Sequence, residues 1–174
     1  MNAADITMGE LLAEFPWARR TLFQRFHIGG CSSCGFSEDE TLAQICQRNK
    51  IFTPEEILSA VKEAHEADEA LMINPQQLRN SLDCFCLVDI RTRPEFDAVH
   101  IPGSLHFNQD LLKDMLTNWP KDRPIVIIDH TGTRSLDAAA YFAGQGFSNV
   151  SCLRGGIDAY SQLADPSLPR YTIE

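Results

Sequence analysis

The N-terminal part of the chain alternates helix-start signals with apolar residues at helical spacing. Thr7 and Glu10 have the spacing of a capping box, in which each side chain bonds the backbone N–H of the other residue at the start of a helix. Apolar residues then recur at helical intervals between Trp17 and Phe26. Gly29 and Gly30 follow, and we expect them to end this helix because glycine adopts the left-handed conformation that helix C-termini favour.

Two further helices are predicted before the pattern changes. Ser37 and Glu40 have the spacing of another capping box, ahead of a helix in which Leu42, Ile45 and Cys46 share one face. The run Thr53-Pro54-Glu55-Glu56 is a third start signal, since proline is favoured at the first helical position. That helix is predicted to end near Leu71. Residues 1–73 are therefore predicted to form a small all-α domain.

From Asn74 onward, short apolar runs alternate with helical patterns. A short helix is predicted to start at Asn74-Pro75. The runs at 85–89 and 125–128 are apolar without alternation, which is typical of strands buried on both faces. Shorter strand candidates and helical patterns complete the series: strands at 104–107 and 150–153, and helices at 111–116, 134–144 and 157–163. This alternation predicts an α/β domain over residues 74–174, with a mainly parallel sheet flanked by helices.

Composition narrows the class of protein. The chain has 174 residues, of which 44% are hydrophobic and 22% charged, as in soluble globular proteins. A net charge of −9 disfavours binding to nucleic acid or to anionic membranes. No apolar run approaches the roughly 20 residues that span a bilayer, and the start lacks the features of a signal peptide. We therefore expect a cytoplasmic protein, whose cysteines act as thiols, metal ligands or redox groups.

Several motifs of the second half occur in the order and spacing of the rhodanese family. They are Leu87-Val-Asp89-Ile-Arg91, Pro94-Glu95-Phe96, His100-Ile-Pro-Gly103, Asp129–Ser135 and Leu153-Arg-Gly155-Gly156. The second half resembles a rhodanese-like domain over residues 75–165. The resemblance implies a six-residue loop, from Asp129 to Arg134, between a strand and a helix. In that family a cysteine opens the loop, accepts a sulfane sulfur as a persulfide and passes it on.

Backbone N–H groups in such a loop converge on one anion. The predicted cradle comprises His130, Thr131, Gly132, Thr133, Arg134 and Ser135. Asp129 stands where the resemblance places the cysteine. A carboxylate cannot carry a persulfide, but it can mimic the charge of a thiolate. We therefore expect the loop to be catalytically silent, with Asp129 either holding the cradle or acting only as a loop cap.

Other matching residues have predicted structural roles. Asp89, Arg91, Glu95 and His100 are expected to brace the turn near the loop through hydrogen bonds. Arg134 either forms an ion pair with Asp129 or binds an external anion.

The first half contains Cys31-Ser-Ser-Cys34 followed by Glu40-Thr41-Leu42. Residues 5–70 resemble a small helical domain associated with hybrid-cluster proteins, in which a Cys-x-x-Cys pair is regarded as a redox disulfide. They are also similar to the N-terminal segment of iron–sulfur cluster repair proteins. Three interpretations remain open. The pair is a dithiol that shuttles electrons or sulfur, a zinc or iron–sulfur site with His27 and Cys46, or part of the packing.

The remaining cysteines are predicted to be buried. Cys84 and Cys86 are placed at a strand start, and Cys152 in a later strand. Burial raises a thiol pKa and blocks access, so Cys31 and Cys34 are expected to be the reactive thiols.

The leading functional hypothesis is a sulfur or iron–sulfur handling protein in which Cys31 and Cys34 carry the chemistry. Its rhodanese-like half would then be a silent docking module. One alternative is a sulfurtransferase that carries a persulfide on Cys31 or Cys34. Another is a structural or sensory metalloprotein with zinc or an iron–sulfur cluster. The expected partner is a sulfur-transfer or iron–sulfur protein, and a homodimer could share cluster ligands.

Overall fold

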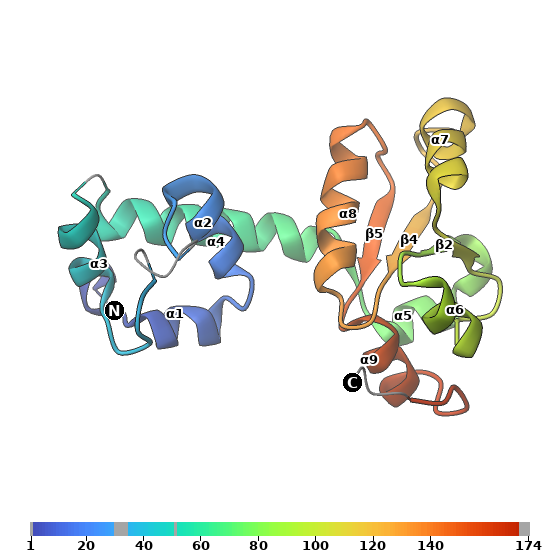
Figure 1. The fold of residues 1–174 in the computed structure, drawn as a ribbon, viewed down its shortest axis with the longest axis horizontal. Helices are drawn as coiled ribbons and strands as arrows, with labels where there is room; N and C mark the ends of the chain where they lie inside the picture. The colour runs from blue at the N-terminus through green and yellow to red at the C-terminus, as the bar shows by residue number, and fades with distance from the viewer. Residues whose placement is uncertain (1, 30–34, 51, 171–174) are drawn as a thin grey trace. The chain divides into compact units, whose positions relative to one another are not determined.

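The computed structural model describes residues 2–29, 35–50 and 52–170 (Figure 1). The chain divides into two compact units, residues 1–70 and 71–174. Cys31 and Cys34 lie outside the described residues.

The N-terminal unit is helical, as predicted. A 3-10 turn, η1 (Ala3–Asp5), precedes helices α1 (Met8–Glu14), α2 (Ala18–Phe26), α3 (Leu42–Asn49) and α4 (Pro54–Ala70). Capping boxes form at the expected places before α1 and α4: the backbone N–H of Thr7 donates to Glu10, and that of Thr53 to Glu56.

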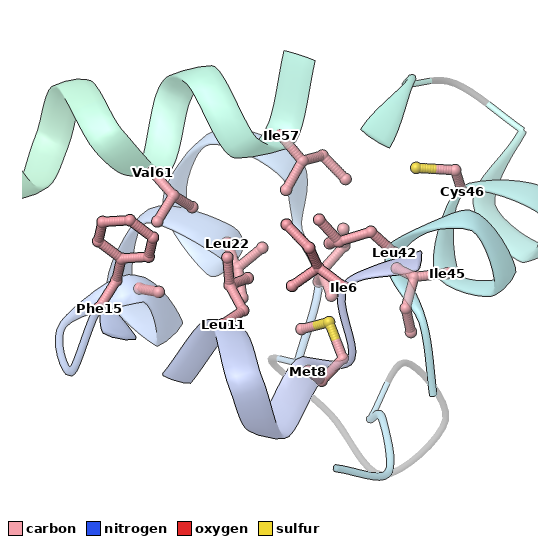
Figure 2. Packing of buried hydrophobic residues seen from close by; sticks show 12 residues of the cluster. Ile6, Met8, Leu11, Phe15, Leu22, Leu42, Ile45, Cys46, Ile57 and Val61 are labelled. Atoms are coloured by element: carbon pink, nitrogen blue, oxygen red, sulfur yellow. The ribbon is translucent and has the colours of Figure 1, made fainter. Parts of the chain in front are cut away.

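These helices enclose one apolar core (Figure 2). Leu22, Leu42, Ile45 and Ile57 are completely buried in it. Their side chains come from α2, α3 and α4, so the predicted helical stripes face one another. Fully burying an aliphatic side chain stabilises a fold by about 1.5–3 kcal/mol, which makes this stripe packing the main source of the unit's stability.

Two predicted helix boundaries are wrong. Helix α2 ends at Phe26, and His27 rather than a glycine takes the left-handed conformation that ends it, with φ 56°. The capping box before α3 is formed by Thr41 and Gln44, not by Ser37 and Glu40, which close a turn instead. The reason is tertiary: Thr41 pairs with Thr7 in an antiparallel bridge, which keeps the chain extended up to that residue.

The C-terminal unit contains a five-stranded parallel sheet in the order β1-β5-β4-β2-β3. The strands are β1 (Met72–Ile73), β2 (Cys86–Asp89), β3 (Leu105–His106), β4 (Ile125–Ile128) and β5 (Val150–Leu153). Each pair of neighbours is parallel, as the sequence predicts. Strand β1 was not predicted, because two residues are too few to show a pattern.

Helices cover both faces of this sheet. The helices are α5 (Pro75–Asn80), α6 (Arg93–Ala98), α7 (Gln109–Asn118), α8 (Thr133–Gly144) and α9 (Gly156–Leu163), with a 3-10 turn η2 (Leu82–Cys84). On one face, Leu78 of α5 and Tyr160 of α9 pack against Val126 and Ile128 of β4. Helix α8 packs against β4 and β5 (Figure 1). This arrangement puts the loop after β4 between the end of a central strand and the start of α8.

Within the described residues, no helix is both long enough and apolar enough to cross a membrane.

Candidate functional site

Asp129 is the first residue after β4 and is almost completely buried, with 2% of its surface exposed. Its carboxylate accepts three hydrogen bonds from the loop and from the start of α8. The Gly132 N–H donates to Oδ1 over 2.7 Å, the Ser135 hydroxyl to Oδ1 over 2.8 Å, and the Arg134 N–H to Oδ2 over 2.9 Å. The loop is therefore curled around an anion that belongs to the protein.

Two glycines make this curl possible. Gly132 has φ +87°, and a Cβ atom there would lie 2.7 Å from the Gly155 nitrogen. A Cβ on Gly156 would lie 2.4 Å from the His130 carbonyl. The start of α9 also donates to the loop, with the Ile157 N–H 2.9 Å from the Asp129 carbonyl oxygen. The Arg-Gly-Gly motif thus lets α9 close against the loop.

The other predicted cradle residues differ in exposure. Ser135 is buried, His130 is half-buried, and Thr131, Thr133 and Arg134 are exposed. The cavity that His130 lines is only about 10 Å³, room for about one water molecule.

Of the two roles predicted for Arg134, the ion pair with Asp129 is not formed among the described residues. The Arg134 backbone N–H holds the carboxylate, while the guanidinium projects to the surface. The reason is that Arg134 lies in the first turn of α8, where the backbone N–H groups have no partner within the helix and point at the loop.

The residues expected to brace the neighbouring turn are hydrogen-bonded. Arg91 holds buried Asp89 through both carboxylate oxygens, with Nη2 2.6 Å from Oδ2, and also donates to the Val99 carbonyl. Glu95 accepts from the backbone N–H of Thr92 at the start of α6.

His100 bonds the Phe96 carbonyl through Nδ1 over 2.8 Å, and its ring stacks on the Phe96 ring. Sequence reasoning did not single out His106, whose Nε2 lies 3.0 Å from the Arg91 carbonyl oxygen. A short edge strand gives no pattern from which this contact could be read.

The model of the rhodanese-like domain family matches residues 74–163, just over half of the chain. The chain belongs to this family. The match of the rhodanese-like domain covers the Asp129 loop, the Asp89–Arg91 turn and the Gly155-Gly156 motif. The fold class of this domain, a parallel sheet flanked by helices, is the one that the sequence predicts.

Relatives of the rhodanese-like domain include named enzymes. A sulfurtransferase of Allochromatium vinosum is 40% identical over 91 residues, which cover 52% of this chain and 84% of that protein. The thiosulfate sulfurtransferase GlpE of Pseudomonas savastanoi is 38% identical over 74 residues, covering 42% and 70%. The Alr3790 protein of Anabaena resembles the chain in fold, with a TM-score of 0.50, 23% identity, and 57% and 82% covered.

Of the four residues predicted to bind a metal, only His27 and Cys46 lie among the described residues. Cys31 and Cys34 lie outside the described residues. His27 is exposed at the end of α2, whereas Cys46 packs in the core of the N-terminal unit (Figure 2). Burial raises the pKa of the Cys46 thiol, and the charges of Glu55 and Glu56 raise it further. Among the described residues, no group of three or more candidate ligands is placed to hold a metal ion.

The prediction that Cys84 and Cys86 are buried is wrong. Cys84 is exposed and Cys86 is half-buried, whereas Cys152 is buried as expected. The reason is that Cys84 ends the turn η2, and the strand begins only at Cys86. An apolar run in the sequence does not show at which residue the strand begins.

Proposed function

We propose that this chain is a sulfur-handling protein in which the loop after β4 does not itself transfer sulfur. Its family and the sulfurtransferases among its relatives support the first part. Asp129 supports the second, because it occupies the position at which the resemblance places the sulfur-accepting cysteine. A carboxylate has no sulfur with which to form a persulfide.

The observation that carries the proposal is the set of three hydrogen bonds to Asp129. Gly132, Arg134 and Ser135 supply donors that a thiolate or persulfide anion would otherwise use. Hydrogen bonds to a charged acceptor are worth about 1.5–3 kcal/mol each, so an external anion competes poorly for the same donors. We infer that the Asp129 carboxylate occupies these donors and prevents an external anion from binding in the loop.

The sulfur chemistry of the proposed function then belongs to the N-terminal unit. We propose that Cys31 and Cys34 act as the redox or sulfur-carrying pair, and that the rhodanese-like domain docks a sulfur-transfer or iron–sulfur protein in the cytoplasm. This part rests on the Cys-x-x-Cys spacing and on the resemblance of residues 5–70 to a redox domain.

The decisive variant is Asp129→Cys. We expect it to gain a persulfide from thiosulfate, because loop length and all three donors remain in place. The introduced thiolate attacks the outer sulfur, the S–S bond of thiosulfate breaks, and sulfite leaves with the electron pair. Mass spectrometry of the intact protein detects the added sulfur, about 32 Da, that this thiolate chemistry requires. The test is made with Cys31 and Cys34 replaced by serine.

Asp129→Ser is the matched control, because serine fits the loop and cannot carry sulfur. The protein with Asp129 should form little thiocyanate from thiosulfate and cyanide. Robust turnover that persists without Cys31 and Cys34 contradicts the proposal of a silent loop. A folded Asp129→Cys variant that takes up no sulfur shows that the donors do not form a cradle.

A further inference from the structure

Two thiols border one groove at the end of the sheet opposite to Asp129. Cys86 begins β2 and is paired in register with Ile125, the first residue of β4, whereas Asp129 follows the last residue of that strand. The groove has a volume of about 440 Å³, and Cys84 and Cys86 both line it. These thiols therefore belong to a site separate from the loop.

The backbone places the two thiols on the same side. Cys84 ends η2, Phe85 is extended with φ −121° and ψ 146°, and Cys86 starts the strand. Both cysteines line the same groove, so their side chains share one side of the chain. Because Phe85 is extended, the Cα atoms of Cys84 and Cys86 lie about 6.6–7 Å apart. This is the upper end of the range of about 4.4–6.8 Å for a disulfide, so the bond closes with a shift of the exposed turn that ends at Cys84.

Arg123 gives this groove a positive charge. Its guanidinium lies 3.9 Å from the centre of the Trp119 ring, a cation–π contact that fixes its position. Arg123 lines the groove together with Cys86. Burial raises the pKa of the Cys86 thiol, while the charge and hydrogen bond of Arg123 oppose that rise. Arg123 also acts on a carboxylate of the protein, since hydrogen bonds from Asn118 and Trp119 and then the charge of Arg123 lower the pKa of Asp114. The groove also contains exposed Asp83, which suits the amino group of an amino-acid ligand.

We propose that Cys84, Cys86 and Arg123 form a second thiol site, which exchanges disulfides with low-molecular-weight amino-acid or peptide thiols. The groove admits a small peptide, and Arg123 binds the carboxylate of the ligand. Exposed Cys84 is the attacking thiol, and Cys86 resolves the product. The site uses none of the residues of the proposed function.

The reaction balances without a further oxidant. The Cys84 thiolate attacks one sulfur of the small disulfide, whose S–S bond breaks, and the first small thiol leaves with the proton lost by Cys84. The thiolate of Cys86 then attacks the Cys84 sulfur and displaces the second small thiol. One protein dithiol is oxidised to a disulfide, and one small disulfide is reduced to two thiols.

Oxidised glutathione tests the exchange in the full chain with Cys31→Ser and Cys34→Ser. We expect protein that loses two hydrogen atoms by mass, retains no adduct, and releases two equivalents of glutathione. Cys86→Ser should trap one glutathione on Cys84, and Cys84→Ser should slow the reaction about tenfold or more, as loss of an accessible thiol requires. The proposal is overturned if protein that retains Cys86 keeps a stable glutathione adduct, or if glutathione attaches to Cys46 or Cys152 instead.

The role of Arg123 is tested by comparing two disulfides. Arg123→Gln should slow attack on oxidised glutathione about tenfold, because a charge-assisted hydrogen bond to the carboxylate is lost. Attack on cystamine, which has no carboxylate, should change little. Arg93→Gln is the matched control, an exposed arginine of the same unit outside the groove. Equal slowing with both disulfides, or no change with either, refutes carboxylate binding by Arg123.

Discussion

Asp129 shows how one residue alters a loop without altering the fold around it. Its carboxylate satisfies the N–H groups of Gly132 and Arg134, which lie at the start of α8 and have no partner within the helix. Removing these bonds would leave buried donors unsatisfied, at a cost of about 1–3 kcal/mol each. The Asp129 side chain thus stabilises the loop, but it provides no thiol that could act as a nucleophile.

Thiol reactivity follows from where each cysteine lies. We expect iodoacetamide to label Cys84 in the native, reduced protein, together with Cys31 and Cys34. Cys46 and Cys152 should stay unlabelled until the protein unfolds, because they are buried and cannot reach the reagent. Peptide mapping by mass spectrometry measures the order. Labelling of Cys152 ahead of Cys84 is the result that contradicts this expectation.

Asp165 should make the stability of the C-terminal unit sensitive to acid. Hydrogen bonds from Ser167, followed by that from Arg79, hold the pKa of Asp165 below its usual range. A lowered folded-state pKa adds stability above the unfolded value of about 3.9, and this stability is lost as pH falls through the folded value.

The measurement is urea unfolding of the wild type and Asp165→Asn between pH 7 and pH 2. The variant should be less stable near neutrality, and the difference should shrink below about pH 4, the unfolded value. A difference that is constant across this range would mean that the carboxylate charge contributes nothing.

The helices α8 and α9 position the loop together. The first supplies donors to the Asp129 carboxylate, and the second supplies donors to backbone carbonyl groups of the same loop. Close approach of α9 requires the glycines that precede it. The loop is thus held by two helices, which explains how its backbone stays fixed while most of its side chains are exposed.

Gly156→Ala should disturb this arrangement. The added methyl group would lie 2.4 Å from the His130 carbonyl, and Gly156 has φ +61°, which side chains rarely adopt. We expect a loss of stability of about 1–3 kcal/mol, measured by urea unfolding. Gly144→Ala is the control, because a Cβ there meets nothing within 4 Å. Equal stability of the two variants would show that α9 does not pack tightly against the loop.

Each unit of the molecule has a core of its own. The N-terminal core gathers side chains from α1 to α4. In the C-terminal unit one apolar cluster lies between the sheet and helices α5 and α9, and buried side chains of α8 pack against the sheet as well. The second unit includes β1, which completes the edge of the sheet beside β5: the Cys152 N–H donates to the Leu71 carbonyl, and the Arg154 N–H to the Ile73 carbonyl.

Two fragments test this division. Residues 71–174 should fold alone and unfold in one cooperative transition. Residues 74–174 lack β1 and should be less stable by about 1–3 kcal/mol, because two hydrogen bonds to β5 are missing. Circular dichroism during urea unfolding measures both. Equal stability would place the start of the unit at residue 74, the boundary that the sequence suggests.

The sequence by itself determined the fold class, because the alternation of apolar strand runs with helical stripes leaves few ways to bury both. It also identified the loop after β4, since the motif residues occur in a fixed order. Only the tertiary structure decided that the Arg134 backbone, not its guanidinium, binds Asp129, and that Thr41 rather than Ser37 caps α3. It alone revealed that Arg123 lines the same groove as Cys86. Such contacts join residues far apart in the chain or depend on where a helix or strand begins, and local periodicity carries no information about either.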